Sequence, residues 1–204
     1  MRINPKDLNR RDAHELLMSA VVPRPIALIS TVDMNGVNNL APFSCFTVAG
    51  LKPARVCVSI DWKRDGQKKD TLTNIEDCRD FVINVVDEEL APQMNQASGE
   101  YPSNVDEFKE VGLTPLSSKM VNAPMVAESP VKMECKVLEI LEFGVIPTGG
   151  HLVIGEVLLA HLREDLWDGN QIDIYKLKAI GRLGGELYCR TTDIFEMKRP
   201  YIFE

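Results

Sequence analysis

The chain has 204 residues, of which 45% are hydrophobic and 26% are charged, and its formal net charge is −7. This length and composition allow a hydrophobic core without disulfides or metals, so we expect one domain over residues 1–204. The negative charge disfavours nucleic acid and anionic membrane surfaces, which attract clustered Lys and Arg. An anionic ligand would therefore need a local site, such as a helix N-terminus or a small cluster of basic residues.

Cysteine spacing and apolar runs give the expected compartment. The five cysteines show no C-x-x-C pair, so we expect neither a disulfide framework nor a metal site. No long apolar run follows the first charges, and the most apolar stretch, 152–162, is too short and too polar to cross a bilayer. We expect a cytoplasmic protein with reduced thiols.

The first third of the chain predicts a helix and three strands. Residues 12–20 form a short amphipathic pattern in which Leu16 and Leu17 face inward. Two β-type runs follow, 26–32 and 37–47, and Asn35-Gly36 between them predicts a hairpin. Residues 55–60 alternate as a third strand.

The second β-type run contains Asn39-Leu40-Ala41-Pro42-Phe43-Ser44. Proline lacks the N–H that a central strand needs, so the strand has an edge or a bulge here. Backbone amides freed in this way can bind a flat ring system. The alternative is a plain edge strand.

A basic cluster precedes the next predicted helix, which Asp70 can cap. A helix N-terminus offers free N–H groups and partial positive charge, which suit a phosphate. Thr71 can add a hydroxyl donor and Lys69 a full charge. The alternative is an ordinary Asp cap beside solvated lysines. The cluster consists of Lys63, Arg64, Lys68 and Lys69.

The remaining elements favour a barrel. Residues 81–86 predict a strand and 88–96 a helix, and 97–130 has little regular structure beyond a helical turn at 105–111. Such a segment is typical of a lid, and its Tyr101 and Phe108 can cover a ring. Strands at 131–143, 151–161 and 179–189 complete the chain. Strands that follow strands favour an antiparallel barrel over a doubly wound sheet.

Motifs for side-chain catalysis are absent from the sequence. It contains no G-x-G-x-x-G, P-loop, H-E-x-x-H or G-x-S-x-G, and its three histidines are dispersed. His151 follows Thr148-Gly149-Gly150 at a strand entry and can face a cleft; the alternative is a loop histidine near solvent. No residue is assigned as catalytic, and a bound cofactor is expected to carry the chemistry.

Taken in order, these motifs resemble the flavin reductase-like family with the FMN-binding split barrel. One departure concerns His151: in the family this histidine often follows Gly-Asp, and here Gly150 replaces the Asp. That replacement weakens the case for nicotinamide binding at His151. The match runs over nearly the whole chain, in the segments 23–31, 39–44, 69–71 with 74–75, 106–108, 112–114, 151 with 155–157, and 182–185 with Tyr188.

The resemblance implies a mainly β fold with a few helices, built as a six-stranded antiparallel Greek-key split barrel. It implies a homodimer with FMN near the interface, redox chemistry at the flavin N5, and NAD(P)H as a co-substrate near His151. The residues that it implies for cofactor binding are Ser30, Thr31, Asn39, Leu40, Ala41, Pro42, Ser44, Ser59, Lys69, Asp70 and Thr71.

The expected function is an FMN-binding oxidoreductase that passes hydride or electrons from NAD(P)H, or another reductant, to a flavin or small acceptor. One alternative is a flavoredoxin-like electron-transfer protein that works with a redox partner protein and binds no nicotinamide. A non-enzymatic FMN-binding module is the other alternative.

Overall fold

The computed structural model describes residues 1–63, 65–146 and 149–200. These residues form three antiparallel sheets and five α-helices, so the expected mainly β fold with a few helices is confirmed. The strands are β1 (Arg24–Pro25), β2 (Ala27–Val32), β3 (Asn38–Phe43), β4 (Phe46–Leu51), β5 (Ala54–Asp61), β6 (Asp80–Val85), β7 (Pro115–Leu116), β8 (Met125–Val126), β9 (Val131–Phe143), β10 (Gly150–Leu162), β11 (Ile180–Arg182) and β12 (Tyr188–Arg190). The helices are α1 (Arg10–Ala20), α2 (Asp70–Cys78), α3 (Ala91–Gln96), α4 (Glu107–Val111) and α5 (Ile174–Leu177), with short 3-10 turns at Pro5–Asp7 and Glu164–Leu166.

The main sheet has the strand order β3-β2-β6-β9-β10-β5-β4 in the described residues, which is seven strands rather than the six expected. The extra strand comes from residues 37–47, which were expected as one strand. The chain turns at Ser44-Cys45, so that β3 pairs with β2 while β4 pairs with β5 at the opposite edge. Both halves keep a β-type pattern, and a hydrophobic pattern carries no signal for the corner between them.

The predicted hairpin and the predicted edge strand are confirmed. β2 and β3 pair from Val32–Asn38 to Ala27–Phe43. Gly36 in the turn has a φ of 85°, which residues with side chains rarely adopt. Because β3 is the outer strand, the N–H that Pro42 lacks costs the sheet no hydrogen bond.

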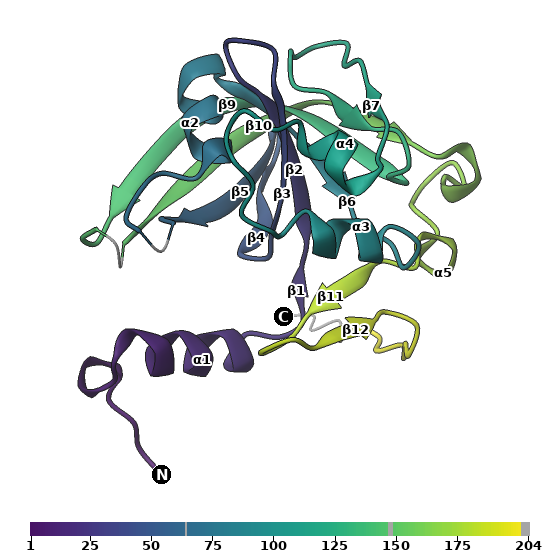
Figure 1. Ribbon diagram of the computed structural model, residues 1–204. Coiled ribbons are helices and arrows are strands. Elements are labelled where there is room, and N and C mark those ends of the chain that lie inside the picture. Colours follow the sequence, from purple (N-terminus) through teal and green to yellow (C-terminus); the bar gives the residue numbers. More distant parts are fainter. Residues whose placement is uncertain (64, 147–148, 201–204) are drawn as a thin grey trace.

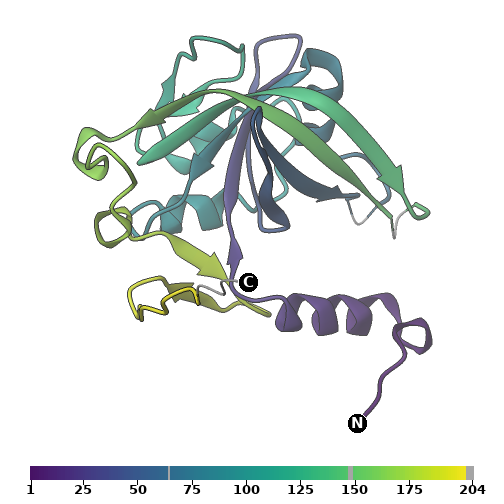
Figure 2. The same cartoon turned by 180° about the vertical axis from the view of Figure 1, so that it is seen from behind.

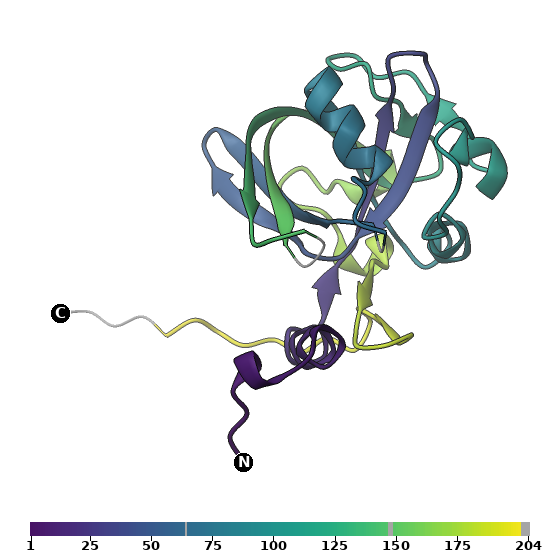
Figure 3. The same ribbon diagram turned by 60° about the vertical axis from the view of Figure 1, so that its left-hand side comes forward.

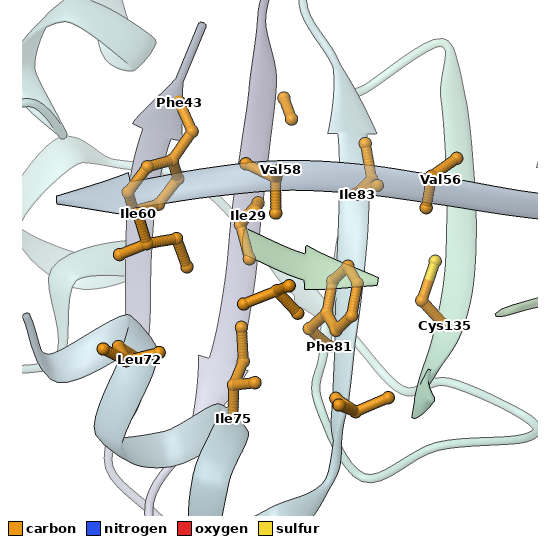
Figure 4. Packing of buried hydrophobic residues seen from close by; sticks show 13 residues of the cluster. Ile29, Phe43, Val56, Val58, Ile60, Leu72, Ile75, Phe81, Ile83 and Cys135 are labelled. Carbon is orange, nitrogen blue, oxygen red and sulfur yellow. The ribbon is translucent and has the colours of Figure 1, made fainter. Parts of the chain in front are cut away.

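The sheet curls into a barrel around a hydrophobic cluster (Figures 3 and 4). β2 is buried on both faces: Ala27 and Ile29 point into the barrel, whereas Leu28 packs in a second cluster with α3 and α4. Gly155 in β10 leaves space for Phe81, because a Cβ there would lie 2.6 Å from the Phe81 ring. The barrel cluster contains Ala27, Ile29, Phe43, Val56, Val58, Ile60, Leu72, Ile75, Phe81, Ile83, Cys135, Val137 and Val153.

The two terminal regions lie together outside the barrel (Figures 1 and 2). β1, β11 and β12 form a small sheet, and α1 extends beneath the barrel. The buried Arg24 joins these parts, because its guanidinium donates to the carbonyl oxygens of Met18, Val21 and Leu183. The C-terminal end of α1 is therefore held by a cation, which suits the negative end of a helix dipole.

No residue of α1 is buried, and Leu17 is 53% exposed while Leu16 is half-buried. The expectation that both leucines face inward is wrong for Leu17. The amphipathic pattern is real, but α1 lies outside the barrel and leaves part of its apolar side uncovered.

The helix expected over 88–96 begins only at Ala91. Before it, Asp87 forms a β-bridge with Ala179, and the Glu88 N–H donates to the Lys178 carbonyl oxygen, so the chain is held extended. The segment 97–130 contains α4, β7 and β8 and is more regular than expected. Within the described residues, no helix has the length and apolar character needed to cross a membrane.

Candidate functional site

The turn before α2 presents unused backbone donors. Lys69 is the N-cap residue of α2, and its carbonyl oxygen accepts from the N–H groups of Leu72 and Thr73 at 2.9 and 3.1 Å. Within the described residues, the N–H groups of Asp70 and Thr71 have no acceptor. Two free donors at the positive end of a helix dipole favour an anion at this position.

Asp70 does not cap α2, so that expectation is wrong. Its carboxylate accepts from the Lys63 amine at 3.0 Å and from the Ser103 hydroxyl at 2.7 Å. Asp70 instead ties the turn to the segment that follows α3. The first turn of the helix is left open as a consequence.

The lysines of the basic cluster differ in their partners. Lys63 pairs with Asp70, and Lys68 pairs with Glu76 at 2.6 Å. Among the cluster lysines, all of which the structure describes, Lys69 alone has no carboxylate within ion-pair distance. Arg64 lies outside the described residues. The positive charge that remains available beside the free N–H groups is therefore that of Lys69.

A buried polar network connects this turn to β3. The Thr71 hydroxyl donates to the Asn39 side-chain oxygen at 2.6 Å, and the Asn39 amide donates to Glu107 at 2.6 Å. Glu107 also accepts from the Leu40 N–H. Because its only proton is committed to Asn39, the Thr71 hydroxyl is not the free donor that was expected, and Thr71 contributes its backbone N–H instead.

Three cavities border this network, and two of them meet at Lys69. We call the smaller one, of about 50 Å³, the turn cavity; it is lined by Asn39, Ala41, Lys63, Lys69, Asp70, Thr71, Gly99, Glu100, Tyr101 and Glu107. We call the larger one, of about 250 Å³, the strand cavity; it is lined by His14, Met18, Ala41, Pro42, Phe43, Ser44, Cys45, Ser59, Asp61, Lys69 and residues 97–100. Ala41, Lys69, Gly99 and Glu100 line both, so a ligand can enter both cavities at once.

Eight of the eleven residues implied for cofactor binding line these two cavities: Asn39, Ala41, Pro42, Ser44, Ser59, Lys69, Asp70 and Thr71. The other three, Ser30, Thr31 and Leu40, are buried. Ser30 donates to the Pro124 carbonyl oxygen, Thr31 accepts from Asn74 at 3.0 Å, and Leu40 packs in the second hydrophobic cluster. The side chains of these three residues serve the fold.

His151 lies inside the end of the barrel rather than in either cavity. It is 2% exposed, and its ring contacts Trp62 edge-on with 4.8 Å between ring centres. Neither ring nitrogen has a hydrogen-bond partner among the described residues, and the nearest carboxylate oxygen, on Glu142, is 4.0 Å away. The expectation that His151 faces a cleft is not met in this structure. Thr148, which was part of that motif, lies outside the described residues.

Several cavity residues were missed by the sequence reasoning. His14 and Met18 of α1 line the strand cavity, together with Cys45 and Asp61. The involvement of His14 and Met18 depends on contacts between distant parts of the chain, for which no local pattern exists, whereas Cys45 and Asp61 lie close in sequence to the expected Ser44 and Ser59. The lid expectation is met in part: residues 97–101 border the cavities, but Phe108 is fully buried and cannot cover a ring.

The chemistry of these residues fits a phosphorylated ring compound such as FMN. Lys69 and the two free N–H groups suit the phosphate, and they lie at the turn cavity. Ala41, Pro42 and Phe43 offer the strand cavity an apolar wall, and Ser44 and Ser59 offer hydroxyl groups. The anion-binding groups of the turn cavity thus lie next to the apolar wall of the strand cavity, as a ring compound with a phosphate group requires.

Comparisons with known proteins bear on the family and the fold of this chain. Residues 18–175 match the flavin reductase like domain. The structure is similar to nitrilotriacetate monooxygenase component B from Bacillus cereus, with a TM-score of 0.93 and 32% identity over 97% of this chain and 98% of that one. It is also similar to 2-nitrobenzoate 2-nitroreductase from Pseudomonas fluorescens, with a TM-score of 0.89 and 30% identity over 100% and 98% of the two chains. A protein with a split barrel domain from Shewanella frigidimarina gives a TM-score of 0.82 and 25% identity over 99% and 100% of the two chains. The protein thus has the split-barrel fold, and it belongs to the flavin reductase-like family.

Proposed function

We propose that this protein is an FMN-binding oxidoreductase that passes hydride or electrons from NAD(P)H, or another reductant, to a flavin or small acceptor. The observation that carries the proposal is the unpaired Lys69 beside two free N–H groups, at the junction of the turn and strand cavities. The similar proteins support it, because one is a component of a monooxygenase and another is a nitroreductase.

A bound flavin would supply the redox chemistry at its ring nitrogen N5. The protein's own residues have three tasks: to bind, to orient and to limit water. Lys69 and the first turn of α2 would hold the phosphate, and Ala41 and Pro42 of the edge strand β3 would line the space for the ring. Residues 97–101 border the open side and restrict solvent.

A flavoredoxin-like carrier is the second candidate, and the burial of His151 favours it. In this structure His151 is buried and lines neither cavity, so no residue is assigned to nicotinamide. A carrier would take its electrons from a redox partner protein. A non-enzymatic FMN module would accept electrons from neither source.

We propose further that the working unit is a homodimer. α1 borders the strand cavity through His14 and Met18, yet none of its residues is buried and Leu17 is exposed. A second subunit that covers α1 would also close the strand cavity. Static light scattering over a dilution series, followed together with flavin fluorescence, should show dissociation and flavin loss at the same protein concentration. A monomer that keeps FMN at full affinity would contradict the dimer.

Anaerobic reduction tests the function. FMN-loaded protein mixed with NADH or NADPH should lose its flavin absorbance if the protein is a nicotinamide-dependent reductase. Persistent colour with both donors, followed by bleaching with a reduced redox protein, would select the carrier. Persistent colour with all three donors would leave only the binding module.

A further inference from the structure

Glu107 is a buried carboxylate that the proposed function does not use. It is the first residue of α4 and is 6% exposed. One carboxylate oxygen, Oε2, accepts from the Asn39 amide at 2.6 Å and from the Leu40 N–H. β3 is an edge strand, so the outward Leu40 N–H has no neighbouring strand, and Glu107 supplies the missing acceptor.

The second oxygen of Glu107 differs from the first. Oε1 has no hydrogen-bond partner among the described residues, and Glu107 lines the turn cavity together with Lys69 and Thr71. Glu107 also lines a cavity of about 260 Å³, whose carboxylates are Asp33, Asp70 and Asp77. This carboxyl therefore borders the space assigned to a phosphate. An ionised carboxylate beside a phosphate dianion is a like-charge contact, which is costly where both groups are shielded from water.

Glu107 faces both signs of charge. Asp70, Glu100, Lys63 and Lys69 line the same cavity, as does Tyr101, and the neighbouring Asp106 is paired with Lys109 at 3.4 Å. Lys63 is already paired with Asp70. Burial raises the pKa of Glu107 to about 7, and Asp70 adds to the rise; the hydrogen bonds from Leu40 and Asn39 oppose it.

We propose that binding of a phosphate monoester in the turn cavity is coupled to the uptake of one proton by Glu107. The protonated carboxyl then offers Oε1–H to a phosphate oxygen, while Oε2 still accepts from Asn39 and Leu40. The inference rests on the phosphate site of the proposed function and assigns Glu107 as the residue that sets the pH range of tight binding.

The direction of the pH effect follows from linkage. A bound anion favours the neutral carboxyl, so the pKa of Glu107 is higher in the complex than in the free protein. Affinity then falls as the pH rises above about 7. The phosphate group has its second pKa at about 6, and its own ionisation would strengthen binding at higher pH. Ionisation of Glu107 therefore lowers the affinity as the pH rises, whereas ionisation of the phosphate raises it.

Isothermal titration calorimetry with FMN and riboflavin, from pH 7 to 8.5 and in buffers of different ionisation enthalpy, tests the coupling. For the wild-type protein we expect the Kd for FMN to rise about tenfold over this range, with measurable proton uptake. The Kd for riboflavin, which has no phosphate, should stay constant. Glu107→Gln keeps the acceptor and places an amide donor in the cavity, so its FMN affinity should not depend on pH. Glu110→Gln, on the exposed side of α4, should behave as wild type.

The outcomes separate the two proposals. Equal wild-type affinity for FMN and riboflavin would remove the phosphate site and with it the proposed function. Preference for FMN without proton uptake, or a pH dependence that survives in Glu107→Gln, would overturn the role of Glu107 alone. Loss of the dependence in Glu100→Gln instead would also overturn it. If Glu107→Gln fails to fold, calorimetry of the wild-type protein still tests the coupling, because FMN binding without proton uptake would overturn it.

Discussion

The start of α2 and the start of β10 both carry motifs that predicted ligand binding, but the first borders two cavities and the second is buried in the barrel. Lys69 keeps an unpaired charge beside free N–H groups and borders two cavities. His151 is buried against Trp62 with neither ring nitrogen bonded among the described residues. The first residue of a helix stays open because its backbone donors have no partner within the helix. A residue at the start of a strand follows the strand's alternation, which here turns it into the barrel.

The largest expected effect is at the first of these sites. Lys69→Ala removes the unpaired cation, and loss of a charge-assisted hydrogen bond costs roughly 1.5–3 kcal/mol. The Kd for FMN should rise about tenfold or more, as measured by quenching of flavin fluorescence. Lys68→Ala is the matched control, because Lys68 pairs with Glu76 and borders neither cavity. Equal losses in the two variants would mean that general positive charge, not Lys69, matters.

The next effect concerns the stability of the ligand-free protein. Glu107 has a pKa of about 7 when folded, against about 4.3 for an unperturbed glutamate. Between these values the folded state binds more protons than the unfolded state, so stability falls as the pH rises. From pH 4.5 to 7.5 the wild-type free energy of unfolding should fall by about 3 kcal/mol relative to Glu107→Gln. Urea denaturation at several pH values measures this, and parallel curves for the two proteins would contradict it.

The smallest effect is expected at His151. Replacing a buried polar group that has no partner by an apolar one is close to neutral, so His151→Leu should change the free energy of unfolding by less than about 1 kcal/mol and leave FMN affinity unchanged. His161→Leu, in the same strand, should cost about 1–3 kcal/mol, because His161 bonds the buried Glu134 at 2.6 Å. A normal fold with an increased KM for NAD(P)H in His151→Leu would show that the barrel end opens to nicotinamide.

Local signals in the sequence predicted most of the strands and the turn at Lys69. The Asn35-Gly36 hairpin, the edge strand at Pro42 and the long strands of 131–143 and 151–161 depend on short-range patterns and are confirmed. The corner at Ser44-Cys45 and the cavity residues of α1 depend on contacts between distant segments. No pattern within either segment could show them.

The partners of charged side chains were also beyond the sequence. Asp70, which has the residue type of a helix cap, binds Lys63 and Ser103 instead, and Thr71 donates to Asn39. Glu107 lies in the segment 106–108 that resembles the family, but no role could be assigned to it, since a glutamate at the start of a helix is ordinary. Only the position of β3 at the edge of the sheet shows that the Glu107 carboxylate accepts the Leu40 hydrogen bond that a neighbouring strand would otherwise accept.

The central claim is that the turn at Lys69 binds a phosphate, and paired titrations of the wild-type protein with FMN and riboflavin at pH 7 test it most directly. The two ligands share the ring and differ in the phosphate. The account predicts that FMN binds at least about tenfold more tightly, since at least one charge-assisted hydrogen bond is at stake. Equal dissociation constants for the two flavins would contradict it.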